Sequence, residues 1–360
     1  MFTTSKVKEL LGRKNCQKNI AIKTADGKIA MDVEEVKSRW SEYIAELFFD
    51  ERPDSSEIRI DDDEGPMIMK DEVKAAIASM KTGKAVGEDG IDVEVIQALG
   101  DFGVDQLTSL FQKMYETGYV VESLCESVFI ALPKVEGTLD CSRHRTLSIM
   151  SQITKILLRV ILKRIRAKIR PQIGDEQFGF VAEKGTANAL FTFRVLAERA
   201  LDVQKDIFAC FVDYEKAFDK VRHEKLFGIL KDLEVDGRDL RLIKNLYWRQ
   251  KAGVRVGEEI SMWQDIRRGV RQGCVLSPDL FNIYSEVIMR DLVELEGVRV
   301  GGGNINNIRY ADDTVLLADS AEKLESLVGA LVRASDRYGL KLNTSKTKVM
   351  VVTKGSDMSS

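Results

Sequence analysis

The sequence predicts an α+β fold, with helices packed on one side of a small, mostly antiparallel sheet. Two apolar segments predict the sheet: residues 207–213 end in Asp213, and residues 308–317 are interrupted by Asp312 and Asp313. The second segment is typical of a strand, a tight turn and a second strand, with the acidic pair in the turn. Around these segments apolar residues recur at helical spacing, which predicts the helices.

The composition limits the possible classes of protein. The 360 residues include 54 Lys and Arg and 57 Asp and Glu, a net charge of −3, which excludes a surface that is basic throughout but leaves room for a local basic groove. Five scattered cysteines and two histidines predict neither a zinc site nor a disulfide framework. They indicate an intracellular protein of the nucleus or cytoplasm, not a secreted one. No apolar run is long enough to span a bilayer, so no membrane partner is expected.

The elements are predicted in chain order from their apolar periods. Residues 1–65 are expected to hold an amphipathic helix at 33–49 and an acidic, solvated linker at 50–64. The helices expected after this part are 71–81, 92–99, 103–117, 152–170, 185–201, 223–233, 238–248, 279–295 and 321–337. Strands are expected at 128–132 and 349–353, besides the two segments above, and a hairpin precedes the loop at Gln272.

The helix at 152–170 carries a stripe of cations that no acid interrupts. Its members are Lys155, Arg159, Lys163, Arg166 and Arg170, and Arg271 belongs to a second basic cluster around Gly269. Most charged helix faces only contact solvent. The lack of any acid favours contact with nucleic-acid phosphates instead, because each neutralised phosphate releases counterions.

The acidic pair Asp312-Asp313 predicts a metal site if Asp213 joins it. Neighbouring carboxylates repel each other, so a partly buried pair needs a cation, and a hard divalent ion prefers oxygen ligands. Alone, an Asp-Asp pair in a turn is usually only a turn. A sheet that brings Asp213 beside the pair would hold three carboxylates on one edge, as in two-metal phosphoryl transfer.

Several stretches resemble the motifs of reverse transcriptases, and their residues and spacing are similar to those of non-LTR (LINE-type) retrotransposons. Residues 211–219 resemble the first catalytic motif and Tyr310-Ala311-Asp312-Asp313 the catalytic hairpin. The other matching stretches are 132–134, 142–145, 177–180, 269–278 and 339–347, so that the resemblance covers residues 66–352. It implies a right-hand polymerase with fingers at 66–205 and palm at 206–357. It also implies an RNA-directed DNA polymerase, which extends a DNA primer on an RNA template with deoxynucleoside triphosphates.

The resemblance also implies a role for each site residue. Asp213, Asp312, Asp313 and the backbone carbonyl of Tyr214 would hold two Mg²⁺ ions, for which Mn²⁺ can substitute. Lys346 would donate a proton to the leaving pyrophosphate, or be an exposed loop lysine. The nucleotide-binding positions are Lys134 and Arg145 for the triphosphate, Gln272 and Gly273 for template and nucleotide, and Phe218 for rejecting a ribose 2′-hydroxyl. Without the resemblance, Phe218 would be a core residue. Asp219 is assigned to turn or helix-cap chemistry and Asp319 to the cap of the helix at 321.

Departures from the family pattern leave alternatives open. Val181-Ala182-Glu183 stands where the family carries basic residues, and Thr146-Leu147 replaces Pro-Ile after Arg145. The family's primer grip and thumb are expected after the strand at 349–353 and are not in these 360 residues, so that a second protein would supply thumb function. The alternatives are a truncated or host-retained relative that keeps the fold, with little or no polymerase activity and a capacity to bind RNA left open, and another carboxylate-metal enzyme such as a nuclease or phosphatase.

Overall fold

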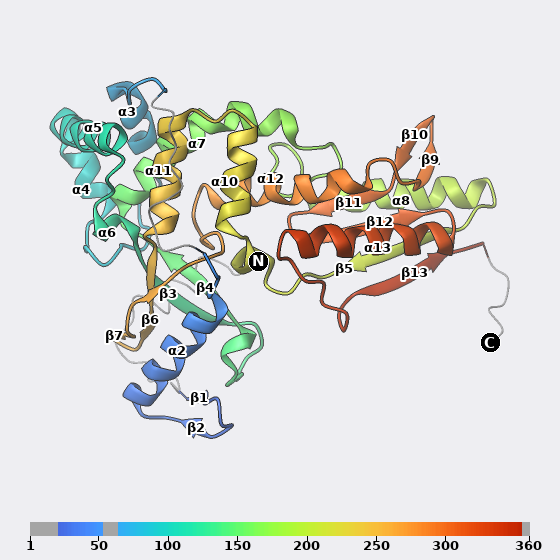
Figure 1. Ribbon diagram of the computed structural model, residues 1–360, viewed down its shortest axis with the longest axis horizontal. Coiled ribbons are helices and arrows are strands. Elements are labelled where there is room, and N and C mark those ends of the chain that lie inside the picture. Colours follow the sequence, from blue (N-terminus) through green and yellow to red (C-terminus); the bar gives the residue numbers. More distant parts are fainter. Residues whose placement is uncertain (1–20, 53–63, 355–360) are drawn as a thin grey trace. The chain divides into compact units, whose positions relative to one another are not determined.

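The computed structural model describes residues 21–52 and 64–354, and its chain divides into two compact units (Figure 1). Unit 1 comprises Met1–Ile165 and Glu234–Leu276, and unit 2 comprises Arg166–Leu233 and Ser277–Ser360. In this division 166–205 belongs to unit 2 and 234–276 to unit 1, and the fingers at 66–205 and the palm at 206–357 stay a prediction. Part of the predicted acidic linker lies outside the described residues.

Unit 1 is built on a mixed sheet. Its strands are β3 (Glu126–Pro133), β4 (His144–Ile149), β6 (Lys251–Val256), β7 (Glu259–Ile260) and β8 (Gln264–Asp265). Their order is β4-β3-β6-β7, with β8 also on β6, and β3 pairs with β6 in parallel. A separate small hairpin joins β1 (Ile22–Lys23) to β2 (Ile29–Ala30). The sequence predicts β3 but not β4, since β4 has no apolar run: polar Thr146 and Ser148 are among its buried positions, and Leu147 between them is only partly buried.

The helices of unit 1 follow the predicted order. They are α2 (Val33–Leu47), α3 (Lys70–Ala78), α4 (Val93–Ala98), α5 (Gly100–Thr117), α6 (Glu122–Cys125), α7 (Gln152–Ile169, which continues into unit 2), α11 (Gly237–Trp248) and the 3-10 turn η1 (Cys141–Arg143). Helix α2 begins at the cap Asp32 and buries Trp40 and Ile44 in one core with Ala252 and Val254 of β6. Helix α2 is therefore part of the core of unit 1.

Unit 2 contains the small antiparallel sheet that the sequence predicts. Its strands are β5 (Ile207–Val212), β11 (Asn307–Tyr310), β12 (Asp313–Ala318) and β13 (Lys348–Val352), in the order β11-β12-β5-β13. Every neighbouring pair is antiparallel. A second hairpin joins β9 (Val298–Val300) to β10 (Gly303–Ile305). The two central strands, β5 and β12, thus come one from each of the two apolar segments that carry the acids.

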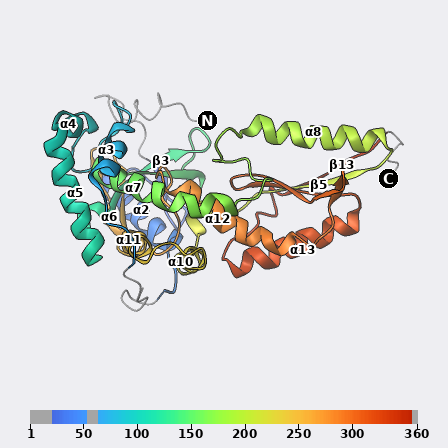
Figure 2. The same ribbon diagram turned by 90° about the horizontal axis from the view of Figure 1, so that it is seen from above.

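Helices cover both faces of this sheet, not one face as the sequence predicts (Figure 2). Helix α8 (Thr186–Asp202) lies on one face, where its Leu196 and Ala200 pack with Ala209 and Leu317. Helix α13 (Ala321–Arg337) lies on the other face. The reason is that β5 and β12 are apolar at nearly every position, so both faces need cover. The remaining helices and turns of the unit are α9 (Ala217–Lys220), α10 (His223–Asp232), α12 (Ser277–Met289), η2 (Arg170–Gln172) and η3 (Arg290–Leu292).

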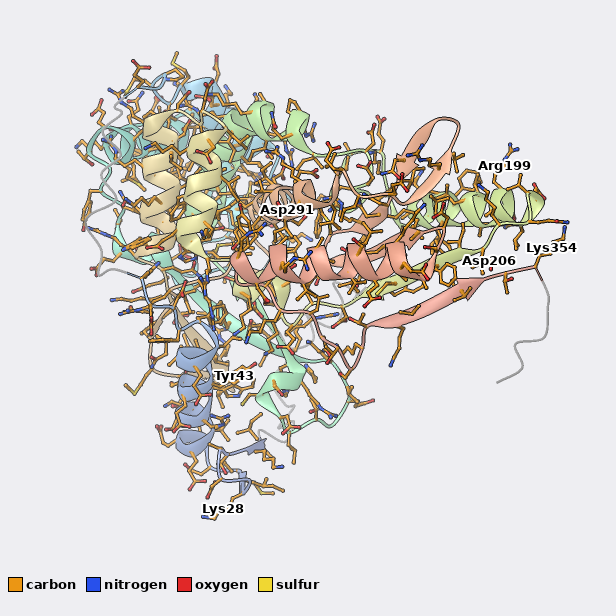
Figure 3. All side chains as sticks on the ribbon, turned by 45° about the vertical axis from the view of Figure 1, so that its right-hand side comes forward. Lys28, Tyr43, Arg199, Asp206, Asp291 and Lys354 are labelled. Carbon is orange, nitrogen blue, oxygen red and sulfur yellow. The ribbon has the colours of Figure 1, made fainter. Side chains whose placement is uncertain are left out.

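The far end of the sheet in unit 2 is charged. Asp206 precedes β5 and Lys354 follows β13, and Figure 3 shows both near Arg199 of α8 at the end away from the β11–β12 turn.

Among the described helices, none is both long and apolar enough to cross a membrane.

Candidate active site

The register of the sheet brings the predicted acids to one end of unit 2. Tyr310 pairs with Asp313 across the β11–β12 turn, and Thr314 pairs with Val212 of β5. One residue further in this register, Asp213 lies across from Asp313. The Asp213 side chain is 34% exposed and Asp313 is also exposed. These two acids therefore lie at the ends of neighbouring strands, where both are accessible to solvent.

The donor atoms at this end suit a hard cation, but they do not form a closed cage. Carboxylates and backbone carbonyls are the oxygen ligands that Mg²⁺ prefers. Among the described residues, no three His, Cys, Asp or Glu side chains gather closely enough to hold a metal ion. The positive charge beside Asp213 is the ammonium of Lys346, whose Nζ lies 3.4 Å from Oδ1. The predicted ligands thus suit Mg²⁺ by the chemistry of their oxygen atoms, but the described side chains do not converge on one point.

The side chain of Tyr214 contacts Ser335, and the backbone carbonyl of Tyr214 is the predicted metal ligand. Its hydroxyl lies 3.1 Å from Ser335 Oγ, and burial raises the pKa of Tyr214 to about 12. The flanking residues bond the backbone at 341–343: Glu215 N donates to Lys341 O, and Asn343 N donates to Asp213 O. Since carbonyls alternate along a strand, the Tyr214 carbonyl points away from residues 341–343, towards the β12 side of β5. That direction is the one the predicted metal ligand requires.

The segment 339–347 fixes the backbone of Asp213. Asn343 N donates to Asp213 O at 2.7 Å, and Asp213 N donates to Thr347 Oγ1 at 3.4 Å. Gly339 begins this segment with φ +73°, and a Cβ there would lie 2.6 Å from Arg222 Nε. The segment therefore holds Asp213 through its backbone and brings Lys346 to its carboxylate.

Phe218 lies in α9 and is partly exposed. Its ring stacks on the buried ring of Phe281 at 4.3 Å between centroids and 14° between planes. Phe180 meets its edge at 6.2 Å. One face is thus packed, as the core interpretation expects, and the residue still reaches the surface, as the sugar-discriminating role requires.

The other nucleotide-binding candidates belong to unit 1. Leu132 pairs with Arg145 in the β3–β4 ladder, and Lys134 N donates to Arg143 O. Paired residues share a face, so Arg145 lies on the face of Leu132, and Lys134, two residues after Leu132, lies on that face as well. Both Lys134 and Arg145 are exposed. Gln272 O accepts from Ser148 N at 2.8 Å.

Gly273 approaches the same face closely. Its φ is +99°, and a Cβ there would lie 2.9 Å from Leu147 Cδ1. The β3–β4 ladder thus brings together the side chains that the resemblance assigns to the triphosphate and the loop that it assigns to the template.

The predicted basic stripe of α7 is largely engaged in packing, which corrects its assignment as an open phosphate-binding face. Lys155 Nζ donates to Ala85 O at 3.2 Å, and Arg159 Nε lies 3.0 Å from Met80 Sδ. Burial lowers the pKa of both side chains. Arg166 forms a bidentate pair with Asp279 at 2.9 and 3.0 Å.

Lys163 and Arg170 are the members of the stripe that the structure leaves exposed. Arg271, from the second predicted basic cluster, is buried. Its Nη2 donates to Leu246 O at 2.9 Å and lies 3.4 Å from Cys125 O. The pattern of cations in the sequence does not reveal these partners, because the partners belong to distant segments of the chain.

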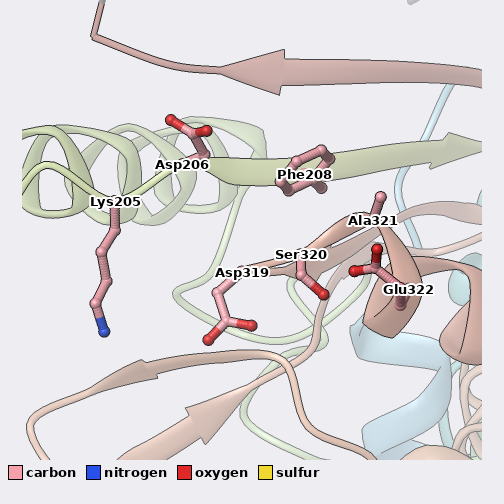
Figure 4. A pocket seen from close by; sticks show the side chains of 7 residues that line it. All are labelled: Lys205, Asp206, Phe208, Asp319, Ser320, Ala321 and Glu322. Carbon is pink, nitrogen blue, oxygen red and sulfur yellow. The ribbon is translucent and has the colours of Figure 1, made fainter.

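The structure corrects the assignment of Asp319 as a helix cap. Ser320, not Asp319, caps α13, and its hydroxyl accepts from Lys323 N at 3.3 Å. Asp319 instead pairs with Lys323 Nζ at 2.7 Å. Asp219 lies inside α9, whose cap position is Lys216. Asp319 also lines a pocket at the far end of the sheet with Lys205, Asp206, Phe208, Ser320, Ala321 and Glu322 (Figure 4).

Comparison with known proteins identifies the family. The family of reverse transcriptases (RNA-dependent DNA polymerases) matches residues 132–357, so the chain belongs to it. This confirms the predicted resemblance and the α+β class, and it implies dependence on a divalent metal. The match includes all the predicted acids and Lys346.

The relatives come from mobile elements. A retrovirus-related Pol polyprotein of the type-1 element R2 from Nasonia vitripennis is 27% identical over 79% of this chain and 27% of its own length. An RNA-directed DNA polymerase from the mobile element jockey of Drosophila funebris is 28% identical over 77% of the chain and 31% of its own length. An uncharacterized 149 kDa protein of transposon TX1 from Xenopus laevis is 26% identical over 83% of this chain and 24% of its own length. The chain thus spans less than a third of the length of these relatives.

Proposed function

We propose that this chain carries the catalytic core of an RNA-directed DNA polymerase of a non-LTR retrotransposon. The observation that carries the proposal is the pairing of Thr314 with Val212, a register that, continued by one residue, would set Asp213 across from Asp313 of the β11–β12 turn, here called the catalytic turn. A sheet that is packed on both faces holds these acids rigidly, as a catalytic site needs. Membership of the reverse transcriptase family and the name of the jockey relative support this reaction.

The proposed site uses two Mg²⁺ ions, with Mn²⁺ as a substitute. Asp213, Asp312, Asp313 and the carbonyl of Tyr214 would hold them. When bound, the ions would lower the pKa of the primer 3′-hydroxyl and offset charge at the α-phosphate. The chain's own groups would do the rest: Asp213 and Asp313 position the reacting atoms, and Lys346 protonates the leaving pyrophosphate.

The substrates follow from the same proposal. They are an RNA template, a DNA primer and deoxynucleoside triphosphates. Lys134 and Arg145, which share one face of the β3–β4 ladder, would bind the triphosphate and offset its developing charge. Gln272 and Gly273 would contact template and nucleotide. Exposed Lys163 and Arg170 are the members of the α7 stripe best placed for phosphates.

Primer extension on an RNA template with Mg²⁺ tests the proposal. We expect extension by the wild-type chain, and none by the Asp312→Asn/Asp313→Asn variant. The matched control is Asp319→Asn, which neutralises an acid at the opposite end of the same sheet and should leave extension unchanged. A wild-type chain that extends no primer with either Mg²⁺ or Mn²⁺, or equal extension by the double variant, would contradict the proposal.

A further inference from the structure

We infer that Gln177 is a positioning residue that sets the backbone of the catalytic turn and thereby aims Asp312 and Asp313. The inference deepens the proposed function and rests on it for the role of the acids. It concerns contacts between residues 174–180 and the β11–β12 turn, all of which lie within unit 2.

The catalytic turn contains a strained residue. Ala311 has φ +59°, in the left-handed region that residues with a Cβ rarely adopt. Ala311 is also buried, so its N–H needs a protein partner. Its neighbours on the C-terminal side are Asp312 and Asp313, whose direction depends on this dihedral angle.

The side chain of Gln177 supplies that partner. Its Oε1 accepts from Ala311 N at 3.0 Å and from Gly179 N at 2.8 Å. Two N–H donors meet the same atom, so this atom must be the amide oxygen and not the nitrogen. Gln177 is fully buried, and water therefore does not compete for its oxygen. One acceptor thus joins the catalytic turn to a segment 134 residues earlier in the chain.

The segment that carries Gln177 is itself fixed against β11. Gln177 forms a parallel bridge with Arg309, flanked by Phe178 N to Arg309 O and Arg309 N to Glu176 O, both at 2.8 Å. The buried Arg309 side chain pairs with Glu286 of α12 at 3.0 Å. These bonds keep the Gln177 oxygen in place when substrates bind at the turn.

Gly179 shows how closely the two segments approach. A Cβ on Gly179 would lie 2.2 Å from Ala311 N and 2.8 Å from Tyr310 C. Both atoms are backbone, so no rotamer change could make room. Asn282 of α12 holds Gly179 from behind, with Nδ2 donating to Gly179 O at 2.8 Å. The stretch Gln177-Phe178-Gly179 therefore provides both an acceptor for the turn and a residue small enough to let the turn approach.

The decisive variant is Gln177→Met, which keeps the length of the side chain and removes the acceptor. We expect kcat for primer extension to fall at least about tenfold, while KM for the template–primer stays unchanged. Glycine adopts positive φ without help, so adding Ala311→Gly should restore most of the lost kcat. The control is Gln152→Met: Gln152 is also buried and donates to Ala85 O at 3.0 Å, and Ala311→Gly should restore nothing there.

Two readouts do not depend on activity. The ¹³C chemical shifts of Ala311 should show left-handed backbone in the wild-type protein and lose that signature in Gln177→Met. The Ala311 amide should exchange slowly with solvent in the wild-type protein, which also decides the matter if Gln177→Met does not fold. Fast exchange, an unchanged signature, or a loss of kcat that Ala311→Gly does not restore would overturn the inference. If the wild-type chain extends no primer, the proposed function fails while these readouts still test the role of Gln177.

Discussion

Acidic residues occur in two contrasting settings in this protein. In unit 1, Arg164 binds Glu72 through two bonds of 2.6 and 2.8 Å and lies 3.7 Å from the buried Asp239. In unit 2, Asp213 and Asp313 lie on strand ends, and both are accessible to solvent. The acids of unit 1 therefore share a largely buried cation, whereas Asp213, at the solvent-accessible end of the sheet, pairs with the exposed cation Lys346.

The difference shows what a charge in the sequence can do. Arg164 also bonds the carbonyls of Pro66 and Met67 at 2.6 and 2.7 Å, so it joins α7 to the chain that precedes α3. Such a cluster stabilises only while it is complete, because a buried charge without a partner is costly. An acid exposed on a strand end has no such cost, and its removal should affect the reaction and not the fold.

The largest effect should come from breaking the buried cluster. Arg164→Leu leaves the partly buried Glu72 and the buried Asp239 without their cation, and we expect the free energy of unfolding to fall by about 3 to 5 kcal/mol. Chemical denaturation measures it. Lys163→Leu, at the exposed neighbouring position of α7, is the control and should change stability by less than about 0.5 kcal/mol. A similar small change for both variants would mean that the cluster contributes nothing.

The pH dependence of stability should show the same cluster. Burial raises the pKa of Asp239 to about 6 from its ordinary value of 3.8, against the lowering effect of Arg164. A raised pKa stabilises the fold below the unfolded value and loses this stabilisation as pH rises through the folded value. Asp239 should therefore destabilise the protein increasingly between about pH 4 and 6, by on the order of 3 kcal/mol.

Denaturation curves of wild type and Asp239→Asn over this pH range provide the measurement. The difference between the two proteins should grow in favour of the Asn variant as pH rises. A constant difference from about pH 4 to 7 would contradict the raised pKa of Asp239.

At the open site, Lys346→Met should slow the reaction without unfolding the protein. Proton donation of this kind contributes on the order of a hundredfold or more, so single-turnover extension should slow by about that factor. Lys346 is largely exposed, so the free energy of unfolding should stay within about 0.5 kcal/mol of wild type. Lys348→Met, in the adjacent strand, is the control. An unchanged rate for Lys346→Met would return it to the exposed-lysine interpretation.

The smallest effect concerns sugar choice. Phe218→Val removes a ring that would reject a ribose hydroxyl by collision, and we expect ribonucleotide incorporation to rise about tenfold relative to deoxyribonucleotide. The ratio is measured in competition on one template. Because Phe218 also stacks on Phe281, some loss of stability is expected. An unchanged ratio in a folded, active variant would leave only the packing role.

Local signals predicted most of the fold. Helix α13 begins and ends at the predicted residues because its apolar period is regular, although Ser320 and not the predicted Asp319 caps it. The antiparallel sheet followed from two short apolar segments that contain acids. What the sequence concealed was tertiary: β4 mixes polar and apolar residues, and α8 covers a face of the sheet that was expected to be open.

The candidate site was predictable in its residues and less so in its surroundings. The turn signal and the resemblance together singled out Asp213, Asp312 and Asp313, whose role as metal ligands stays a prediction. Arg271 could not be recognised as buried, since its acceptors Cys125 and Leu246 lie 146 and 25 residues away. The role of Gln177 was concealed for the same reason, although a Gly two residues later is the kind of signal that indicates a close approach of two backbones.

The most direct test of the contrast between the two settings is to measure extension and unfolding on one variant, Asp313→Asn. Our account predicts that primer extension with Mg²⁺ falls at least about a hundredfold. It also predicts that the free energy of unfolding stays equal or rises, because neutralising one of several neighbouring carboxylates relieves repulsion. Extension close to the wild-type rate, or a loss of activity that is explained by unfolding, would contradict the assignment of this sheet end as the active site.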